Sequence, residues 1–128
     1  MGRFILSANP NNFQFYAPFY LQEEIERHLS KIMKISGLSE IQIRRILLLL
    51  YSQINFIACS QVPFEIHLKA YGYVHDIDLD DIPFVALTEY LEEVLWTGDE
   101  ELYKGLVNKG YERVIQFETM RKIHHLDV

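Results

Sequence analysis

The sequence predicts an α/β sandwich, and three observations support this. Short apolar runs alternate along the chain with longer segments whose apolar residues recur every three or four positions. Turn-forming residues such as Gly37 and Gly110 separate these segments. The chain of 128 residues is 49% hydrophobic, which suits one folded domain over residues 1–128. Strands that alternate with helices are expected to be parallel, with helices packed on the sheet.

The first half of the chain predicts two strands and two amphipathic helices, in the order strand 13–16, helix 19–35, helix 39–51 and strand 54–58. Gly37 is placed to cap the first helix. Ser39 and Gln42 form a capping-box pattern at the start of the second. We expect the Leu47–Leu50 run of that helix to be largely buried.

The second half predicts three helices, two strands and a final helix capped by Thr119. The expected order is helix 63–74, an acidic loop, helix 83–93, strand 94–97, helix 99–107 and strand 114–117. Four strands are therefore predicted in all. Binding sites of such sheets form at the carboxyl ends of the strands, and Thr97 to Asp99 lie at one of these ends.

Charge and cysteine content narrow the classes of function. A net charge of −6 argues against nucleic-acid binding by bulk basicity, although metal-binding carboxylates would themselves make the charge negative. The single cysteine, Cys59, gives no disulfide framework and suits a reducing cytoplasm. No apolar run reaches about 18 residues, so no membrane span is expected.

Carboxylates at helix starts are the main functional signal. Residues 76–81 contain four aspartates in six positions, and Asp81 lies just before a predicted helix. Asp99 follows a predicted strand, and Glu23 and Glu24 lie early in the first helix. Mg²⁺ and Mn²⁺ prefer such oxygen ligands. The alternatives are helix capping by Asp81 and Asp99 and a solvated face for the two glutamates.

Two motifs resemble the second half of a PIN domain. They are Asp78-Leu-Asp-Asp-Ile-Pro-Phe-Val-Ala-Leu87 and Leu95-Trp-Thr-Gly-Asp-Glu-Glu-Leu102. The segment Phe15–His28 resembles the second strand of that family and its following helix, so the resemblance runs from about residue 12 to the end of the chain. It implies a three-layer α/β/α sandwich with a mostly parallel sheet.

The resemblance also implies a chemistry. PIN domains are typically Mg²⁺- or Mn²⁺-dependent ribonucleases in which a metal-activated water attacks an RNA phosphodiester, and many are toxins of toxin–antitoxin pairs. Single-stranded RNA and an antitoxin protein are the partners this implies. The catalytic and metal-binding carboxylates implied for this chain are Glu24, Asp81 and Asp99.

Three further residues take secondary places in the resemblance. Glu23 is the alternative to Glu24 as the helix carboxylate. Asp78 matches the first acid of the D-x-x-D pair and is more peripheral, and Thr97 would lie beside the site.

The chain departs from the family at its beginning. The family starts with an apolar strand that ends in a metal-binding Asp, whereas the first acid here is Glu23 and Ser7 stands in the matching pattern Phe4–Asn9. Too few residues separate Asn9 from the strand at 13–16 for a parallel crossover. We therefore expect residues 4–6 to match the end of the family's first helix, and the chain to be an N-terminally truncated PIN domain.

The expected gap lies in the centre of the sheet, between the second and fourth family strands. Residues 2–7 can enter it antiparallel, the flanking strands can close together, or a second chain can fill it in a homodimer, which we favour. Without the first Asp, activity is in doubt. The second hypothesis is a catalytically inactive PIN-like binding or oligomerisation module, or a truncated gene product.

Overall fold

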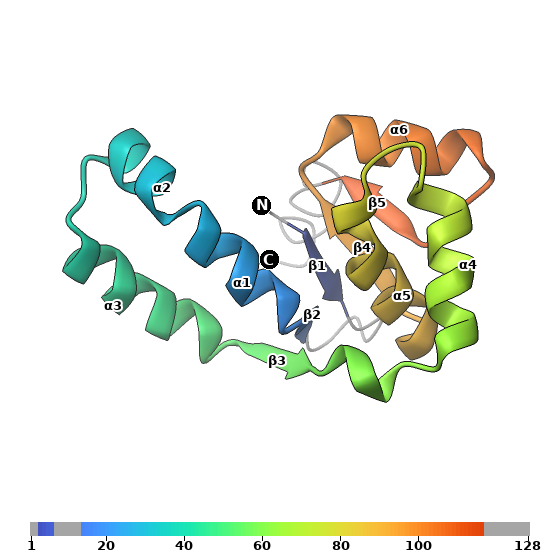
Figure 1. The fold of residues 1–128 in the computed structure, drawn as a ribbon, viewed down its shortest axis with the longest axis horizontal. Helices are drawn as coiled ribbons and strands as arrows, with labels where there is room; N and C mark the ends of the chain where they lie inside the picture. The colour runs from blue at the N-terminus through green and yellow to red at the C-terminus, as the bar shows by residue number, and fades with distance from the viewer. Residues whose placement is uncertain (1–2, 7–13, 117–128) are drawn as a thin grey trace, which may run out of the picture.

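A five-stranded sheet forms the centre of the molecule (Figure 1). The computed structural model describes residues 3–6 and 14–116. The strands are β1 (Arg3–Leu6), β2 (Phe15–Pro18), β3 (Ile54–Ile57), β4 (Val94–Thr97) and β5 (Val114–Gln116), in the sheet order β3-β2-β1-β4-β5. The helix predicted after Thr119 lies outside the described residues.

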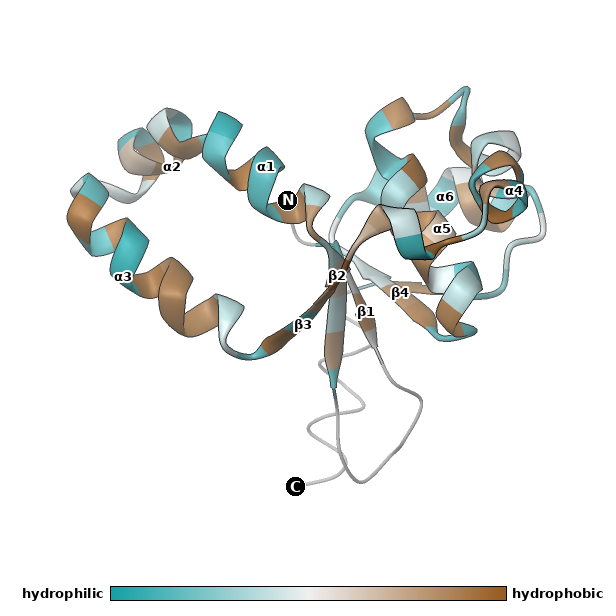
Figure 2. Ribbon diagram, turned by 60° about the horizontal axis from the view of Figure 1, so that its bottom comes forward, coloured by the Kyte–Doolittle hydropathy of each residue, from teal (hydrophilic) through white to brown (hydrophobic). Residues whose placement is uncertain are grey.

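Two groups of helices lie on either side of the strands (Figure 2). One group is α1 (Tyr20–Arg27), α2 (Leu29–Ser36) and α3 (Glu40–Tyr51), and the other is α4 (Phe64–Val74), α5 (Ile82–Leu91) and α6 (Glu100–Asn108). Short 3₁₀ turns, η1 (Cys59–Gln61) and η2 (Leu79–Asp81), precede α4 and α5. The predicted α/β class is confirmed.

The central strand β1 runs antiparallel to both of its neighbours. Ile5 pairs with Tyr16 of β2 and with Leu95 of β4. The outer pairs, β2 with β3 and β4 with β5, are parallel, as the prediction of a mostly parallel sheet requires. The two antiparallel pairings of β1 are the departure from that prediction.

Residues 3–6 therefore fill the expected gap themselves. The prediction that residues 4–6 match the end of a helix is wrong. We favoured a second chain as the partner that pairs with the backbones of the flanking strands, but residues 3–6 of the same chain make this pairing. The reason lies in the connection to β2. An antiparallel neighbour can be reached by a short loop, whereas a parallel one needs a crossover of about a dozen residues or more.

Helices α1 to α3 form an arm that extends from the sheet (Figure 1). The predicted helix 19–35 is divided at His28, whose φ of −102° and ψ of 10° interrupt it. Gly37 ends α2 with a left-handed φ of 73°, which glycine adopts without a Cβ penalty. The Ser39–Gln42 capping box is present at the start of α3.

The expected burial of Leu47–Leu50 is wrong. Leu47 is half-buried, but Leu48 and Leu49 are 71% and 72% exposed. Consecutive helical residues point about 100° apart, so four leucines in a row cannot all face one neighbour. Within α3, Ile43, Leu47 and Tyr51 repeat at four-residue spacing and are the less exposed positions.

Helix α5 is the most buried helix and positions the acidic residues. Its middle from Phe84 to Thr88 is buried, and it packs on β1, β2 and β4 and on α4. Asp81 is its N-cap residue and Pro83 lies in its first turn.

No helix in the described part of the chain is long and apolar enough to cross a membrane.

Candidate acidic site

Glu24 and Asp81 are the two buried carboxylates of the described chain. Glu24 lies in α1, directly after β2, and is 5% exposed. Asp81 lies at the start of α5 and is fully buried. A buried carboxylate is tolerated only where a counter-charge or hydrogen bonds compensate the loss of water.

Arg3 supplies the counter-charge to both. Its Nη2 donates to both oxygens of Glu24, at 2.6 and 2.7 Å, and its Nη1 donates to Oδ1 of Asp81. Arg3 is itself 6% exposed. Side chains alternate along a strand, so Arg3 points to the same face of the sheet as buried Ile5, the face that α5 covers.

An aromatic ring completes the surroundings of the guanidinium. The Arg3 guanidinium carbon lies 4.4 Å from the centroid of the Phe84 ring, which favours the cation through the ring quadrupole. Tyr20 packs edge-on against the same ring, with centroids 6.4 Å apart. Removing one partner of such a buried ion cluster is strongly destabilising, because it leaves the other charges uncompensated.

The charges and hydrogen bonds of this cluster are not fully balanced. One guanidinium against two carboxylates leaves one net negative charge. Oδ2 of Asp81 and Nε of Arg3 are buried and have no hydrogen-bond partner among the described residues. The cluster therefore contains one carboxylate oxygen without a hydrogen-bond partner and one negative charge without a counter-charge.

The donor chemistry fits a hard divalent cation. Two carboxylates that converge on one cation position, one of them with an unpartnered oxygen, are the ligands that Mg²⁺ commonly takes together with waters and phosphates. A divalent ion would also neutralise both charges. Among the described side chains, however, no three or more His, Cys, Asp or Glu residues are grouped to hold a metal ion.

The third predicted carboxylate, Asp99, caps a helix. Its Oδ1 accepts hydrogen bonds from the backbone N–H groups of Glu101 and Leu102, at 3.0 and 3.2 Å, which is the capping alternative. Asp99 is exposed, and its own N–H donates to Oγ1 of Thr97 at 2.9 Å. Capping does not prevent a second role, so Asp99 as a metal ligand stays a prediction.

Thr97 connects Asp99 to the buried cluster. It is fully buried at the carboxyl end of β4 and is the register partner of Arg3 on β1. Asp99 therefore follows β4 at the same end of the sheet as Arg3. The predicted place of Thr97 beside a metal site stays a prediction.

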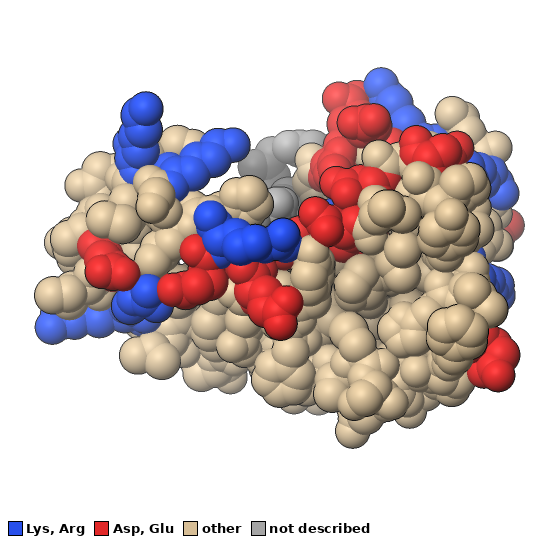
Figure 3. All heavy atoms as spheres, in the orientation of Figure 1, with Lys and Arg blue, Asp and Glu red and all other residues tan. Residues whose placement is uncertain are grey.

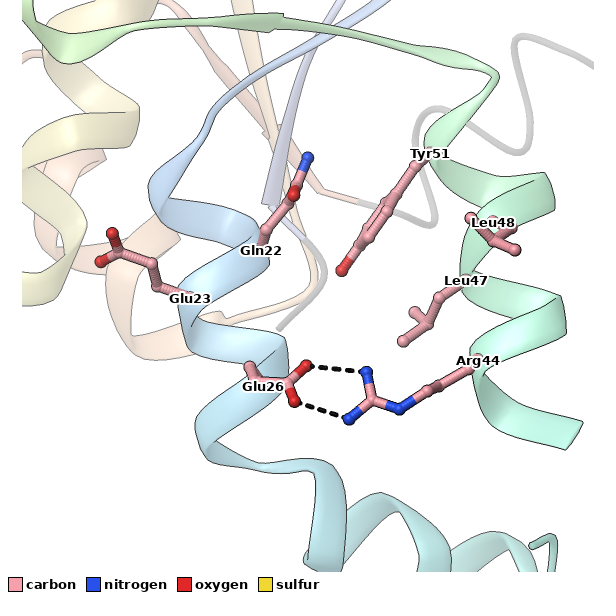
Figure 4. Close-up of a pocket in the computed structure, with 7 residues that line it drawn as sticks. All are labelled: Gln22, Glu23, Glu26, Arg44, Leu47, Leu48 and Tyr51. Carbon is pink, nitrogen blue, oxygen red and sulfur yellow. Dashed lines mark hydrogen bonds and ion pairs between the residues drawn. The ribbon is translucent and has the colours of Figure 1, made fainter. Parts of the chain in front are cut away.

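Glu23 does not share the buried place of Glu24. Consecutive residues of a helix point in different directions, and Glu23 is exposed. It lines a cavity of about 490 Å³ between α1 and α3, together with Glu26, Arg44 and Tyr51 (Figure 4). Of the two predicted alternatives, Glu24 is the one beside Asp81.

Asp78 and Asp80 serve the turn before α5 at the surface. Oδ1 of Asp78 accepts the N–H of Asp80 at 2.9 Å and so caps η2. The Tyr20 hydroxyl donates to Oδ1 of Asp80 at 2.6 Å, and Arg27 donates to Tyr20 at 2.7 Å. The hydrogen bond to Asp80 raises the pKa of Tyr20.

The surface around η2 and the start of α6 is acidic. Figure 3 shows acidic side chains gathered there. The exposed acids of these elements and their caps are Asp78, Asp80, Asp99, Glu100 and Glu101. Such a surface repels phosphate unless cations are bound, because carboxylates and phosphates are both negatively charged.

Sequence reasoning missed Arg3, the cation of this site. One signal was available: Arg3 is the only basic residue before Arg27, and it begins an apolar run, Phe4 to Leu6. A charge at the start of an apolar strand suggests a buried partner of opposite sign. The prediction that residues 4–6 end a helix hid this signal.

The fold and the two buried carboxylates define a PIN-like nuclease scaffold. The chain belongs to the PIN domain family, whose model matches residues 2–124. Members of this family are generally nucleases that use divalent metals. Neither a curated protein nor a solved structure matches this chain.

Proposed function

We propose that this chain is a metal-dependent ribonuclease of the PIN type that hydrolyses RNA phosphodiesters. The observation that supports this best is the convergence of Glu24 and Asp81 on one cation position. These two residues would hold Mg²⁺ or Mn²⁺, and Asp99 would act from the neighbouring strand end. The ion, when bound, would activate a water and stabilise charge on the phosphodiester.

The chain's own residues have defined tasks in this proposal. Glu24 and Asp81 are held in place by α1 and by the start of α5, so their carboxylates need little reordering to bind a cation. Thr97 fixes the turn to Asp99 through its hydrogen bond to the Asp99 N–H. Because the surrounding surface is acidic, the substrate phosphate can approach only when cations neutralise part of its charge.

Single-stranded RNA in the cytoplasm, a toxin role, an antitoxin partner and a homodimer are finer parts of the same proposal. The RNA substrate, the toxin role and the antitoxin rest on family membership, and the cytoplasm rests on the single cysteine. The homodimer has lost its original reason, because residues 3–6 fill the gap in the sheet. The exposed leucines of α3 support a protein partner, since exposed apolar patches commonly mark interaction surfaces.

A specific observation favours a second candidate, a catalytically inactive binding or oligomerisation module. Arg3 already occupies the cation position between Glu24 and Asp81. A guanidinium neutralises charge but activates no water. In this candidate the cluster is purely structural.

Cleavage of single-stranded RNA separates the two candidates. We expect weak cleavage by the wild type with millimolar Mn²⁺, abolished by chelator and by the Asp81→Asn/Asp99→Asn double variant. Arg44→Gln on the distant arm is the matched control and should cleave like the wild type. Circular dichroism must show that the double variant is folded. Cleavage that survives chelator or the double variant would contradict the proposed site, and no cleavage would favour the inactive module.

A further inference from the structure

We infer that Arg3 is the resident cation of the acidic site and that its side chain and a divalent metal ion exclude one another. The inference rests on the proposed function for the metal ion, but the ion pair itself can be tested without one. It concerns a residue of this chain that lies outside the predicted ligand set.

Position is the first argument. Both Nη atoms of Arg3 lie within hydrogen-bond distance of the carboxylates that would ligate the metal, and Nη2 contacts both Glu24 oxygens at 2.6 and 2.7 Å. A metal ion bound by oxygens of both residues would need the space of the guanidinium. The two cations therefore cannot share the pair.

Burial is the second argument. Arg3, Glu24 and Asp81 are 6%, 5% and 0% exposed, so water screens the attraction between them little. The Phe84 ring closes one side of the guanidinium. Removing Arg3 without a replacement leaves two buried like charges, which a divalent ion would compensate.

The place of Arg3 in the chain is the third argument. It is the first residue of β1, while the strand is anchored by Ile5, which is fully buried. The side chain can therefore leave the pair without the strand leaving the sheet. Exchange of Arg3 for a metal ion is then a local change at the end of the central strand.

The first arm of the test is a double-mutant cycle in chelator, with thermal unfolding as the readout. We expect Arg3→Gln to lower the melting temperature by about 10 °C or more, and Arg3→Gln/Asp81→Asn to lower it less, because the second change removes an uncompensated charge. If Arg3→Gln is unfolded, restoration of folding by Asp81→Asn gives the same answer. Additive effects, or no rescue, would overturn the inference.

The second arm adds Mn²⁺ and measures both the melting temperature and the loss of the free-ion electron paramagnetic resonance signal. Mn²⁺ should stabilise Arg3→Gln by several degrees and bind it at least about tenfold more tightly than the wild type, since a ligand stabilises the state that binds it. Arg44→Gln is the matched control, because Arg44 also bridges two carboxylates but at the surface, and it should behave like the wild type.

The outcomes distinguish this inference from the proposed function. Equal Mn²⁺ binding by wild type and Arg3→Gln would overturn mutual exclusion and leave the metal-dependent function standing. Binding by neither would overturn the proposed metal chemistry and mutual exclusion together, and the chelator cycle alone would then decide whether Arg3 is the resident cation.

Discussion

Two arginines in the described part of the chain each bridge two carboxylates, in opposite environments. Arg3 joins Glu24 and Asp81 inside the protein, with side chains 7%, 7% and 0% exposed. Arg44 joins Glu26 and Glu40 on the arm, at 2.7 and 3.0 Å, with side chains that are about half exposed. The contacts are alike, and the surroundings differ.

The difference in burial determines how much each group of charges contributes to stability. Around Arg44, water screens each ion and can replace each contact, so the pairs contribute little to stability. Around Arg3, no water can replace the missing partner, so the three charges depend on one another. The same contrast holds for apolar residues: Ile5 of β1 is buried, whereas Leu48 and Leu49 of α3 are exposed.

The largest expected effect tests this contrast with apolar side chains. Ile5→Ala should lower the free energy of unfolding by about 2–5 kcal/mol, because Ile5 is fully buried in the central strand. Leu49→Ala should change it by no more than about 0.5 kcal/mol, because Leu49 is 72% exposed. Urea unfolding followed by circular dichroism measures both. Equal losses at the two positions would show that α3 is covered in solution or that β1 is not a core strand.

A smaller effect tests the contrast with charge. Arg3→Lys keeps the charge, but one ammonium cannot reproduce the planar guanidinium that reaches two carboxylates. We expect a loss of about 1.5–3 kcal/mol, the usual value for a hydrogen bond to a charged group, measured by urea unfolding in chelator.

Arg44→Lys is the control for that measurement. It should leave the unfolding midpoint unchanged within error, since its partners Glu26 and Glu40 stay solvated either way. A loss as large as that of Arg3→Lys would show that burial does not separate the two clusters.

The outer parts of the fold were predictable from local patterns. The capping box at Ser39, the glycine cap at Gly37 and the parallel outer strand pairs follow from short-range residue preferences and alternation. The exposure of the leucine run of α3 was not predictable. An apolar run indicates that a packing partner is needed, but it does not indicate whether the same chain provides that partner.

The site was predictable in its carboxylates and not in its cation. Glu24 lies in the helix that follows a strand, and Asp81 lies at the start of a helix. The structure brings both carboxylates to one guanidinium. Their role as metal ligands stays a prediction. Antiparallel entry of residues 2–7 was one of three alternatives, and the sequence did not decide among them, since the pairing of β1 depends on strands far along the chain.

The smallest expected effect concerns salt. The hydrogen bond from Arg44 lowers the pKa of Glu26, which shows a favourable interaction, but both groups are exposed to solvent. At about 1 M salt the Debye length falls to about 3 Å, so the coupling between them should vanish. A double-mutant cycle of Arg44→Gln and Glu26→Gln, unfolded in low and high salt, measures this loss.

The Arg3 cluster should respond differently to the same change of salt. Its coupling with Asp81 should persist in high salt, because mobile ions cannot enter between side chains that are buried against Phe84. The cycle of Arg3→Gln and Asp81→Asn under both conditions gives the comparison. If salt removes both couplings alike, the ions reach the interior cluster, and Arg3 then leaves the carboxylates often enough for a metal ion to compete with it.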